Sequence, residues 1–382
     1  MEIVMKKHFL TISSYILVAA LSTFLTLHFL PHSGKLAELE TLIEERFIGE
    51  AEEKALEDAA ANAMVKATGD RWSYYMSAEE YEVYREQVDN SYVGIGVTIQ
   101  LEEEEGYRIL EVASGGPAEE AGIQVGDLLF EVEGQDARKM DINEVRNLVK
   151  GKAGTSVKLR ILRKGESLSF TVQRRKVETP VATFELLEKN VGLVTIENFD
   201  SRCADESIAA IESLLKQGAK AIVFDVRNNP GGYADELVKL LDYLLPEGDL
   251  FRTVRYDGKE HVDTSDKDFL DLPMAVLVNG SSYSAAEFFA AALKEYEAAV
   301  VIGEQTVGKG YFQTTYPLSD GSAVALSIGK YYTPDGINLS EAGGLTPDLV
   351  IEMDEETEAA LYYDTLPRNE DPHILAAIEK LS

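Results

Sequence analysis

Cysteine is almost absent from this sequence of 382 residues, in which Cys203 is the single example. One cysteine excludes an internal disulfide and any zinc site built from several cysteines. A lone cysteine can serve as a nucleophile, but no histidine lies near Cys203 in the sequence. We therefore favour a small, half-buried residue in the turn region of residues 200–205.

Histidine is also scarce, and this limits the catalytic groups that are available. Five occur in the chain, at His8, His28, His32, His261 and His373. The first three lie in or beside an N-terminal apolar segment, which leaves one in a polar loop and one in the C-terminal tail. A histidine-based triad or a histidine-rich metal site has little to draw on, so hydrolytic chemistry here is predicted to use another base.

Positive charge is the third shortage. Lysine and arginine number 36 against 67 aspartates and glutamates, and the formal net charge is -31. Such a surface repels nucleic acid, and no long basic stretch offsets it, so we predict no nucleic-acid partner. Apolar residues make up 45% of the chain, enough for packed cores, and the length allows two or three domains.

One long apolar run is present, from Phe9 to Leu30, and Lys6 and Lys7 precede it. As a helix this run would be about 33 Å long, enough to span a bilayer. A cleaved signal peptide would have a shorter apolar region and a small-residue cleavage site, and residues 30–34 make a poor one. We favour an uncleaved anchor over residues 1–34, with the lysines placing the rest of the chain outside the cytoplasm.

Residues 35–88 are predicted to form a helical N-terminal region. Apolar side chains recur there at helical spacing, at Leu36, Leu39, Leu42, Ile43 and Phe47. An alanine-rich run follows over residues 52–68. The apolar stripe is either an oligomerisation face, which would give a homodimer through these helices, or a surface packed onto the chain's own core.

Residues 89–176 change to a strand pattern. Residues 92–99 have a glycine-rich entry and then alternate with period two. A helix is expected over Asp141–Val149. The run at residues 116–127 reads Gly-Pro-Ala-Glu-Glu-Ala-Gly-Ile-Gln-Val-Gly-Asp, and it resembles a PDZ domain of the circularly permuted bacterial kind.

The PDZ resemblance implies a peptide-binding site. Backbone N–H groups of the Gly94/Gly96 loop would bind a peptide's terminal carboxylate. The adjacent strand and the helix over Asp141–Val149 would flank a groove in which the peptide adds as a strand. The residues assigned to peptide binding are Tyr92, Val93, Gly94, Ile95 and Gly96.

Residues 177–382 alternate short apolar strands with helices, which predicts an α/β core with buried parallel strands. In such cores, chemistry gathers in loops beyond the carboxyl ends of the strands. The expected strands are Val191–Ile196, Ala221–Val226, Met274–Val278, Val300–Ile302 and Tyr311–Pro317, and the expected helices are Ala204–Lys216, Tyr233–Leu245 and Ala285–Tyr296.

Three loops of this core carry candidate chemistry. Residues 227–232 read Arg-Asn-Asn-Pro-Gly-Gly, and paired glycines can expose N–H groups to a ligand, although a plain strand-to-helix turn explains them alone. Ser284 ends the second loop at a helix start, where unpaired N–H groups can stabilise an oxyanion. Ordinary N-capping is the usual explanation for a serine there.

The third loop, residues 303–310, superficially matches a phosphate-binding P-loop. That motif requires Ser or Thr after the lysine and then a helix, whereas Gly310 and a predicted strand follow Lys309. We reject a P-loop. A solvated turn lysine is the ordinary reading, but the flanking glycines let the backbone fold tightly around it. Gln313 lies four residues on and can orient the amine.

Together the loops resemble the carboxyl-terminal processing peptidases, or tail-specific proteases. The resemblance also covers Gly69-Asp70, Ser73–Met76, residues 225–232, Gly303–Gln313, Asp320–Ser322 and residues 331–336. It implies a crotonase-like α/β protease core with an inserted PDZ domain, and a location at the bacterial cell membrane. The implied domains are an anchor over 1–34, helices over 35–88, the PDZ domain over 89–176 and the peptidase core with its tail over 177–382.

The resemblance also implies the chemistry. Ser284 would be the nucleophile, Lys309 the general base and Gln313 the residue that orients the lysine. The N–H groups of Gly232 and Ala285 would form the oxyanion hole. No metal or cofactor is implied, and the substrates would be proteins or peptides with exposed C-terminal tails.

The chain departs from the family pattern at three places. Ala286 stands where another serine is common, Arg71-Trp72 replaces Pro-Tyr, and Gln124 replaces a basic residue that couples docking to activation in some relatives. Two other functions remain open: a non-catalytic peptide-binding scaffold, and a crotonase-like hydratase or hydrolase of small acyl compounds. Intact Ser284, Lys309 and Gln313 argue against a scaffold, and the PDZ domain argues for a peptide substrate.

Overall fold

The computed structural model describes residues 34–102, 105–363 and 365–382. The predicted anchor, residues 1–34, therefore lies outside the described residues apart from its last one. Within the described ranges, no helix combines the length and the apolar character that crossing a membrane requires. Contacts divide the chain into two units, one formed by residues up to Ser77 with Thr315–Leu326 and the other by Ala78–Thr314 with Ser327–Ser382.

The first unit is a pair of helices and part of a strand hairpin. It contains α2 (Lys35–Arg46), α3 (Glu53–Lys66) and β1 (Tyr74–Met76). Strand β1 pairs antiparallel with residues 323–325. The helices expected over residues 35–88 are confirmed, but the short strand β1 interrupts them.

The second unit opens with α4 (Ala78–Val88) and a small β domain. This domain contains one helix of two turns, α6 (Ile142–Val149). Its strands are β2 (Ser91–Gly94), β3 (Val97–Glu102), β4 (Gly106–Val112), β5 (Leu128–Val132), β6 (Gln135–Asp136), β7 (Ser156–Arg163), β8 (Glu166–Gln173) and β9 (Arg175–Glu178). Strand order is β3-β4-β5-β7-β8, while β2 pairs separately with β9. The expected loop at Gly94 and Gly96 separates β2 from β3, and the chain turns at Gly96, where φ is +78°.

The α/β core is built on a six-stranded sheet of order β10-β11-β12-β15-β16-β19. Its strands are β10 (Ala182–Leu186), β11 (Val191–Ile196), β12 (Ala221–Asp225), β15 (Met274–Val278), β16 (Ala299–Gly303) and β19 (Leu349–Val350). Every pair is parallel except β10 with β11. The predicted parallel core is confirmed, with strand ends within one residue of expectation.

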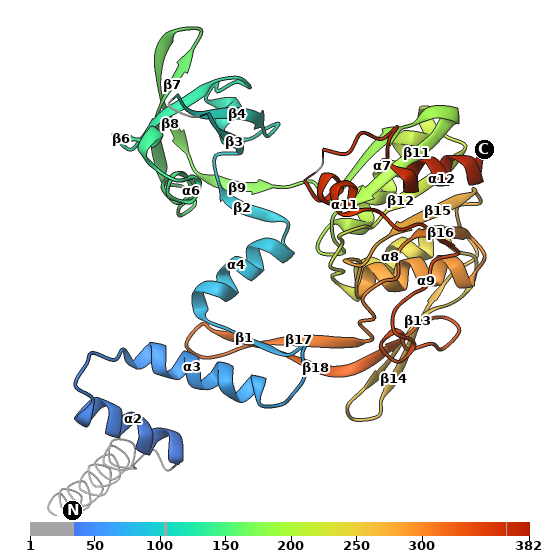
Figure 1. The fold of residues 1–382 in the computed structure, drawn as a ribbon, viewed down its shortest axis with the longest axis horizontal. Coiled ribbons are helices and arrows are strands. Elements are labelled where there is room, and N and C mark those ends of the chain that lie inside the picture. Colours follow the sequence, from blue (N-terminus) through green and yellow to red (C-terminus); the bar gives the residue numbers. More distant parts are fainter. Residues whose placement is uncertain (1–33, 103–104, 364) are drawn as a thin grey trace, which may run out of the picture. The chain divides into compact units, whose positions relative to one another are not determined.

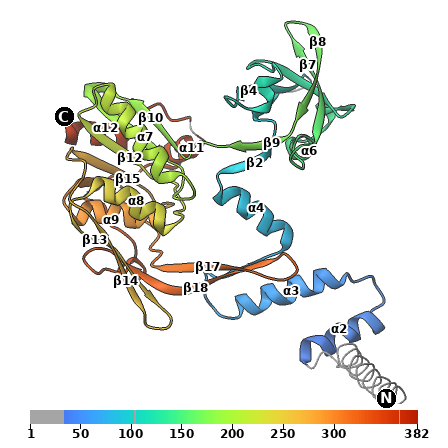
Figure 2. The same ribbon diagram turned by 180° about the vertical axis from the view of Figure 1, so that it is seen from behind.

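Alternate side chains of this sheet enter two cores. Ile222 and Phe224 pack with helices α7 (Cys203–Lys216), α8 (Ala234–Leu244) and α9 (Ala285–Glu295), whereas Ala221 and Val223 pack with α12 (Pro372–Leu381). Burial on both faces explains why the strands are unbroken apolar runs. The helices cover the sheet in Figure 1, and Figure 2 shows it from behind.

A second sheet, of order β1-β18-β13-β14 with β17 paired to β18, was not expected as a whole. It contains β13 (Gly248–Arg255), β14 (Glu260–Ser265), β17 (Tyr311–Pro317) and β18 (Ala323–Tyr332). The long β17–β18 hairpin is plain in Figure 1. His261 lies on β14, not in a loop, and its exposed ring is 3.1 Å from Asp263 Oδ1. The remaining short elements are α5 (Pro117–Glu120), η1 (Ala137–Lys139), η2 (Glu188–Asn190), α10 (Leu339–Ala342) and α11 (Glu355–Tyr362).

Candidate active site

The first two candidate loops follow the neighbouring strands β12 and β15 and are bonded to one another. Asn228 N–H donates to Asn279 Oδ1 at 2.9 Å, and the Asn279 amide donates back to Asn228 Oδ1 at 2.9 Å. Tyr283 N–H donates to Asn229 O at 3.1 Å. The structure therefore brings together the paired-glycine loop and the serine loop, as the strand-end argument predicted.

Ser284 has an unusual backbone at the start of α9. Its φ is 58° and its ψ is -127°, outside the regions that non-glycine residues ordinarily occupy. Strain of this kind persists only where the surroundings enforce it, and it clusters at functional sites. Ser282 Oγ donates to Val226 O at 2.7 Å and holds the turn just before Ser284. Ser284 is thus more than an ordinary N-cap.

The paired glycines pack against the serine. A Cβ atom on Gly231 would lie 2.7 Å from Ser284 Cβ and 2.8 Å from Ala285 N, and the φ of Gly231 is +89°. Only glycine fits there. The result is that the backbone of Gly231 lies directly beside the first turn of α9.

Two N–H groups near Ser284 are suited to an oxyanion. Gly231 N–H donates to Asn229 Oδ1 and Tyr233 N–H donates to Phe199 O. Between them, Gly232 N–H donates to no group among the described residues, and neither does the Ala285 N–H at the helix N-terminus. Unpaired N–H groups at such a place stabilise developing negative charge.

Glu287 connects the serine loop to the lysine loop. Its carboxylate accepts Ser284 N–H at 2.9 Å, Gly308 N–H at 2.6 Å and Lys309 N–H at 2.8 Å, as well as the Thr306 hydroxyl. The side chain is fully buried. Sequence reasoning missed this residue, although a serine followed three residues later by glutamate is the pattern of a capping box.

The Lys309 amine lies close to the serine loop. Its Nζ is 5.7 Å from the centroid of the Tyr283 ring, the residue before Ser284, and Lys309 is half-buried. Burial and the nearby Asp200 carboxyl raise the pKa of Tyr283 above its usual range. A strand follows Lys309, as the rejection of a P-loop required.

Gln313 lies on β17, where its amide donates to Ser327 Oγ at 3.0 Å and to Tyr311 O at 3.3 Å. These bonds connect it to β18 and to its own strand. The role of orienting Lys309 stays a prediction.

A buried ionic network supports the paired-glycine loop from behind. Arg227 Nη2 lies 2.6 Å from Asp225 Oδ2 and 2.8 Å from Asp371 Oδ2. Burial lowers the pKa of Arg227, but these carboxylates more than offset it, so that pKa lies above its ordinary value. The loop is thereby bonded to the residue that begins α12.

His373 is part of this network and not of a free tail. It is fully buried on α12, with Nδ1 3.4 Å from Arg227 Nη1 and Nε2 2.9 Å from Ile351 O. Burial lowers the pKa of His373, which favours the neutral ring. Sequence analysis placed His373 in the C-terminal tail, and the structure shows that it lies on α12 and contacts the arginine of the first loop.

Cys203 and Asp200 lie beside the same loop. Cys203 is fully buried and free, and burial raises the pKa of its thiol well above its usual range, which makes it inert as a nucleophile. It is more deeply buried than expected. Burial, with the nearby Glu236 carboxylate, raises the pKa of Asp200 to about 7.

The predicted peptide-binding residues line a hollow of about 410 Å³ in the small β domain. Tyr92, Gly94, Ile95 and Gly96 line it, together with Val97–Ile99 and residues of α6. Val93 is not among the lining residues, and it pairs with Lys176 between β2 and β9.

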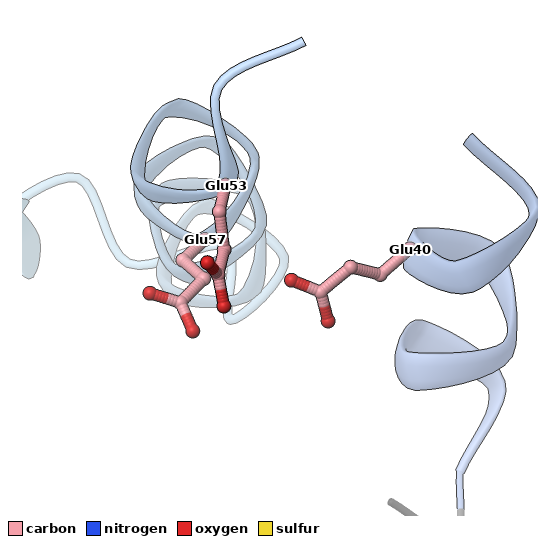
Figure 3. A group of neighbouring side chains, drawn as sticks. All are labelled: Glu40, Glu53 and Glu57. Atoms are coloured by element: carbon pink, nitrogen blue, oxygen red, sulfur yellow. The ribbon is translucent and has the colours of Figure 1, made fainter. Parts of the chain in front are cut away.

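One group of acidic side chains within the described ranges is close enough to hold a cation. Glu40 on α2 faces Glu53 and Glu57 on α3, with ligand oxygens within 4.8 Å of one another (Figure 3). Two of the three are exposed. Exposed acidic groups gather without a metal in many proteins, and we assign no site here.

Comparison with known proteins gives two matching families and several relatives. The model of peptidase family S41 matches residues 190–351, and that of the PDZ domain matches residues 108–163. A probable CtpA-like serine protease of Staphylococcus haemolyticus is 35% identical over 300 residues, which are 78% of this chain and 60% of that protein. The carboxy-terminal processing protease CtpA of Bacillus subtilis is 33% identical over 323 residues, 84% of this chain and 69% of that one.

One solved structure agrees in fold. A putative S41 protease from Bacteroides fragilis superposes with a TM-score of 0.54 at 19% identity, covering 90% of this chain and 96% of that one. The chain thus spans the whole of that fold, but only about 60% of the length of the staphylococcal relative.

Proposed function

Because the chain belongs to peptidase family S41, we propose that it is a serine endopeptidase that cleaves proteins near their C-termini, with Ser284 as nucleophile and Lys309 as base. The observation that carries this proposal is the Glu287 carboxylate, which binds the backbone of both Ser284 and Lys309. The two groups come from different loops, and one buried anion fixes their backbones together.

The proposed reaction uses groups of this chain and one water molecule. The neutral Lys309 amine accepts the Ser284 hydroxyl proton while the serine oxygen attacks a peptide carbonyl. The N–H groups of Gly232 and Ala285 stabilise the oxyanion. The amine returns the proton to the leaving nitrogen, and water then hydrolyses the acyl-enzyme. Gln313 would orient the amine of Lys309.

The PDZ domain is proposed to dock or gate the substrate's tail. Among the strands that the structure describes, β3 pairs only with β4, so one edge is available for an added peptide strand. The hollow beside that edge is lined by the loop at Gly94–Gly96.

The partners include a membrane and a second copy of the chain. The apolar run from Phe9 to Leu30 would anchor the protein in a bacterial cell membrane, with the catalytic part outside the cytoplasm. The homodimer would form through the N-terminal helices, where the exposed apolar residues are Leu36, Leu39, Leu42, Phe47, Ile48 and Met64. These helices and residues 318–322 surround a hollow of about 760 Å³.

The test of the catalytic assignment compares variants of the purified full-length protein on one fluorescent peptide. Ser284→Ala and Lys309→Ala should each lose all measurable turnover while keeping the native circular dichroism spectrum. Gln313→Ala should retain partial activity. The exposed His261→Ala serves as the control and should match wild type, whereas His373→Ala is unsuitable because that ring is buried.

A serine-directed covalent probe separates an enzyme from a scaffold. Labelling of wild type but not of Ser284→Ala supports a nucleophilic serine. Peptide turnover against thioester turnover then separates a protease from an acyl hydrolase. Near-normal turnover by a folded Lys309→Ala variant would defeat the assignment of the base.

A further inference from the structure

The peptide groove of the small β domain is lined by positive charge, whereas the chain as a whole is strongly negative. Its lining includes two cations, Arg146 and Lys150, and no acidic residue. The chain as a whole carries 67 acidic against 36 basic residues. A groove with cations alone is therefore a local departure from the surface around it.

Both cations lie on the face of α6 that borders the groove. Ile142, Arg146 and Val149 follow at helical spacing, and Lys150 caps the helix. Lys150 Nζ is 5.6 Å from the Tyr92 ring and 3.4 Å from Glu86 Oε2. That ion pair is partly exposed, and such pairs contribute little, so a ligand carboxylate can compete for the lysine.

The glycine loop is prepared for a carboxylate at the same end. The carbonyls of Ile95 and Gly96 already accept the N–H groups of Ala118 at 2.8 Å and Ala113 at 2.9 Å. The N–H groups of Ile95 and Gly96 donate to no described residue. Lys150, next to Tyr92, adds a cation to this set of donors.

Helix and strand geometry then place the second cation. Arg146 precedes Lys150 by four residues, which is about 6 Å along a helix. Two residues of an extended peptide span about 6.6 Å, and their side chains point the same way. If the terminal carboxylate lies at the glycine loop and Lys150, the side chain two residues upstream lies opposite Arg146.

The floor of the groove suits an apolar last residue. Ile95, Leu129 and Val149 line it and are themselves buried. A C-terminal aliphatic side chain would pack against them, on the same side of the peptide as the residue facing Arg146.

We propose that this groove selects C-terminal tails that end in an apolar residue and carry Asp or Glu two residues before it, with Arg146 reading the acidic side chain. The inference rests on the proposed function, because it names the class of tail that the PDZ domain delivers to the peptidase. The uncleaved tail is the ligand, and no chemical step is added.

The test is fluorescence anisotropy of labelled hexapeptides with the full-length Ser284→Ala protein in low salt. The peptides end in leucine and differ only two residues before it, with Glu, Gln or Lys there. Glu should bind about five- to tenfold more tightly than Gln, and Lys more weakly than Gln. In Arg146→Gln the difference between Glu and Gln should disappear, and in Arg146→Glu the lysine peptide should bind best.

Arg138→Gln is the matched control, because Arg138 is an exposed arginine of the same domain that pairs with Asp136 outside the groove. It should keep the wild-type preference. Equal affinity for the Glu and Gln peptides, a preference that survives Arg146→Gln, or no binding of any of the peptides would overturn the inference.

Cleavage of tagged substrates with the same tails, measured with wild type, separates this inference from the proposed function. Selective binding without cleavage supports the groove assignment and rejects the peptidase assignment. Cleavage together with equal binding of all tails rejects the groove assignment alone.

Discussion

Replacing Glu287 should disturb the site while leaving the side chains of the proposed nucleophile and base unchanged. In Glu287→Gln, one of the two acceptor oxygens becomes an NH2 group that faces N–H donors from Ser284, Gly308 or Lys309. We expect a loss of stability of about 2–4 kcal/mol. We also expect kcat to fall by about 100-fold, since small misplacements of reacting groups have effects of that size.

Urea unfolding and kcat of the folded fraction measure the two effects separately. Thr306→Val is the control, because it removes one donor to the same carboxylate, together with the acceptor of Leu345 N–H, and leaves the carboxylate itself in place. It should lower stability less and leave most of the activity. A folded Glu287→Gln enzyme with wild-type kcat would show that this carboxylate does not position the site.

Asp200 should make stability depend on pH in an unusual direction. Its folded pKa is about 7 against 3.8 for the free side chain, because burial and then Glu236 disfavour the charged form. Between these values the unfolded chain has released a proton that the folded chain retains. Stability contributed by this group therefore falls as pH rises from about 4 to 7, by at most about 4 kcal/mol.

Replacing the carboxyl removes that dependence. The stability of Asp200→Asn relative to wild type should rise between pH 4.5 and pH 8, as followed by urea denaturation at a series of pH values. Asp268→Asn, at an exposed position, should leave the curve unchanged. Parallel curves for wild type and Asp200→Asn would contradict the burial argument.

At the scale of single residues, the sequence predicted parts of the site where a residue type is uncommon at that position in a loop or helix. Glycines beside Lys309 and a serine at a helix start marked two of the loops, and the structure brings those loops together. Glu287 was not recognised, because its partners Gly308 and Lys309 lie about 20 residues further along the chain. No local pattern records such contacts.

At the scale of elements, α12 is fixed to the core by a buried charge. Asp371 accepts from His373 N at 3.0 Å as the N-cap of α12, and it also binds Arg227. Asp371→Asn keeps an acceptor for the cap but leaves the buried arginine with less compensation. We expect a loss of about 3–5 kcal/mol, measured by urea unfolding.

Asp354→Asn provides the comparison for that substitution. Asp354 caps α11 by accepting from Thr357 N at 2.8 Å, it is exposed, and none of the described arginines forms an ion pair with it. Because Asn and Asp cap about equally well, this variant should change stability by less than about 0.5 kcal/mol. Similar losses in the two variants would mean that capping, not the ion pair, is what Asp371 supplies.

Strands were predictable from the sequence where both of their faces are buried. Strands β11, β12, β15 and β16 have apolar side chains on both faces, and their unbroken apolar runs gave their bounds closely. Strands β13 and β14 bury a minority of their side chains, and their mixed sequences do not stand out.

At the scale of the whole molecule, the sequence did not show that Thr315–Leu326 groups with the N-terminal helices. These residues lie more than 200 positions from α3, and the contact follows from pairing of β1 with residues 323–325. Strand pairing over such separations depends on the fold around it. The apolar stripe on α2 had two readings; Leu36 and Leu39 are exposed in the described part of the chain, and the dimer stays a proposal.

The proposed dimer has to form against the negative charge of the whole chain. Each full-length copy carries a net charge of -31, and residues 35–382 alone are one unit more negative, so two copies repel one another. Salt shortens the range of this repulsion, from a Debye length of about 30 Å at 0.01 M to about 8 Å at 0.15 M. An apolar contact through Leu39 would not be weakened in the same way. The dissociation constant should therefore fall several-fold between 20 and 300 mM sodium chloride, as measured by sedimentation equilibrium of residues 35–382.

Two substitutions separate an apolar interface from general charge screening. Leu39 lines the hollow between the helices and is 52% exposed, whereas Leu375 on α12 is 47% exposed and does not line that hollow. Leu39→Asp should be a monomer at every salt concentration, and Leu375→Asp should follow wild type. Each variant adds one negative charge, so a difference between them reflects position and not charge. A wild-type protein that stays monomeric in high salt would exclude the dimer, and association that survives Leu39→Asp would place the interface elsewhere.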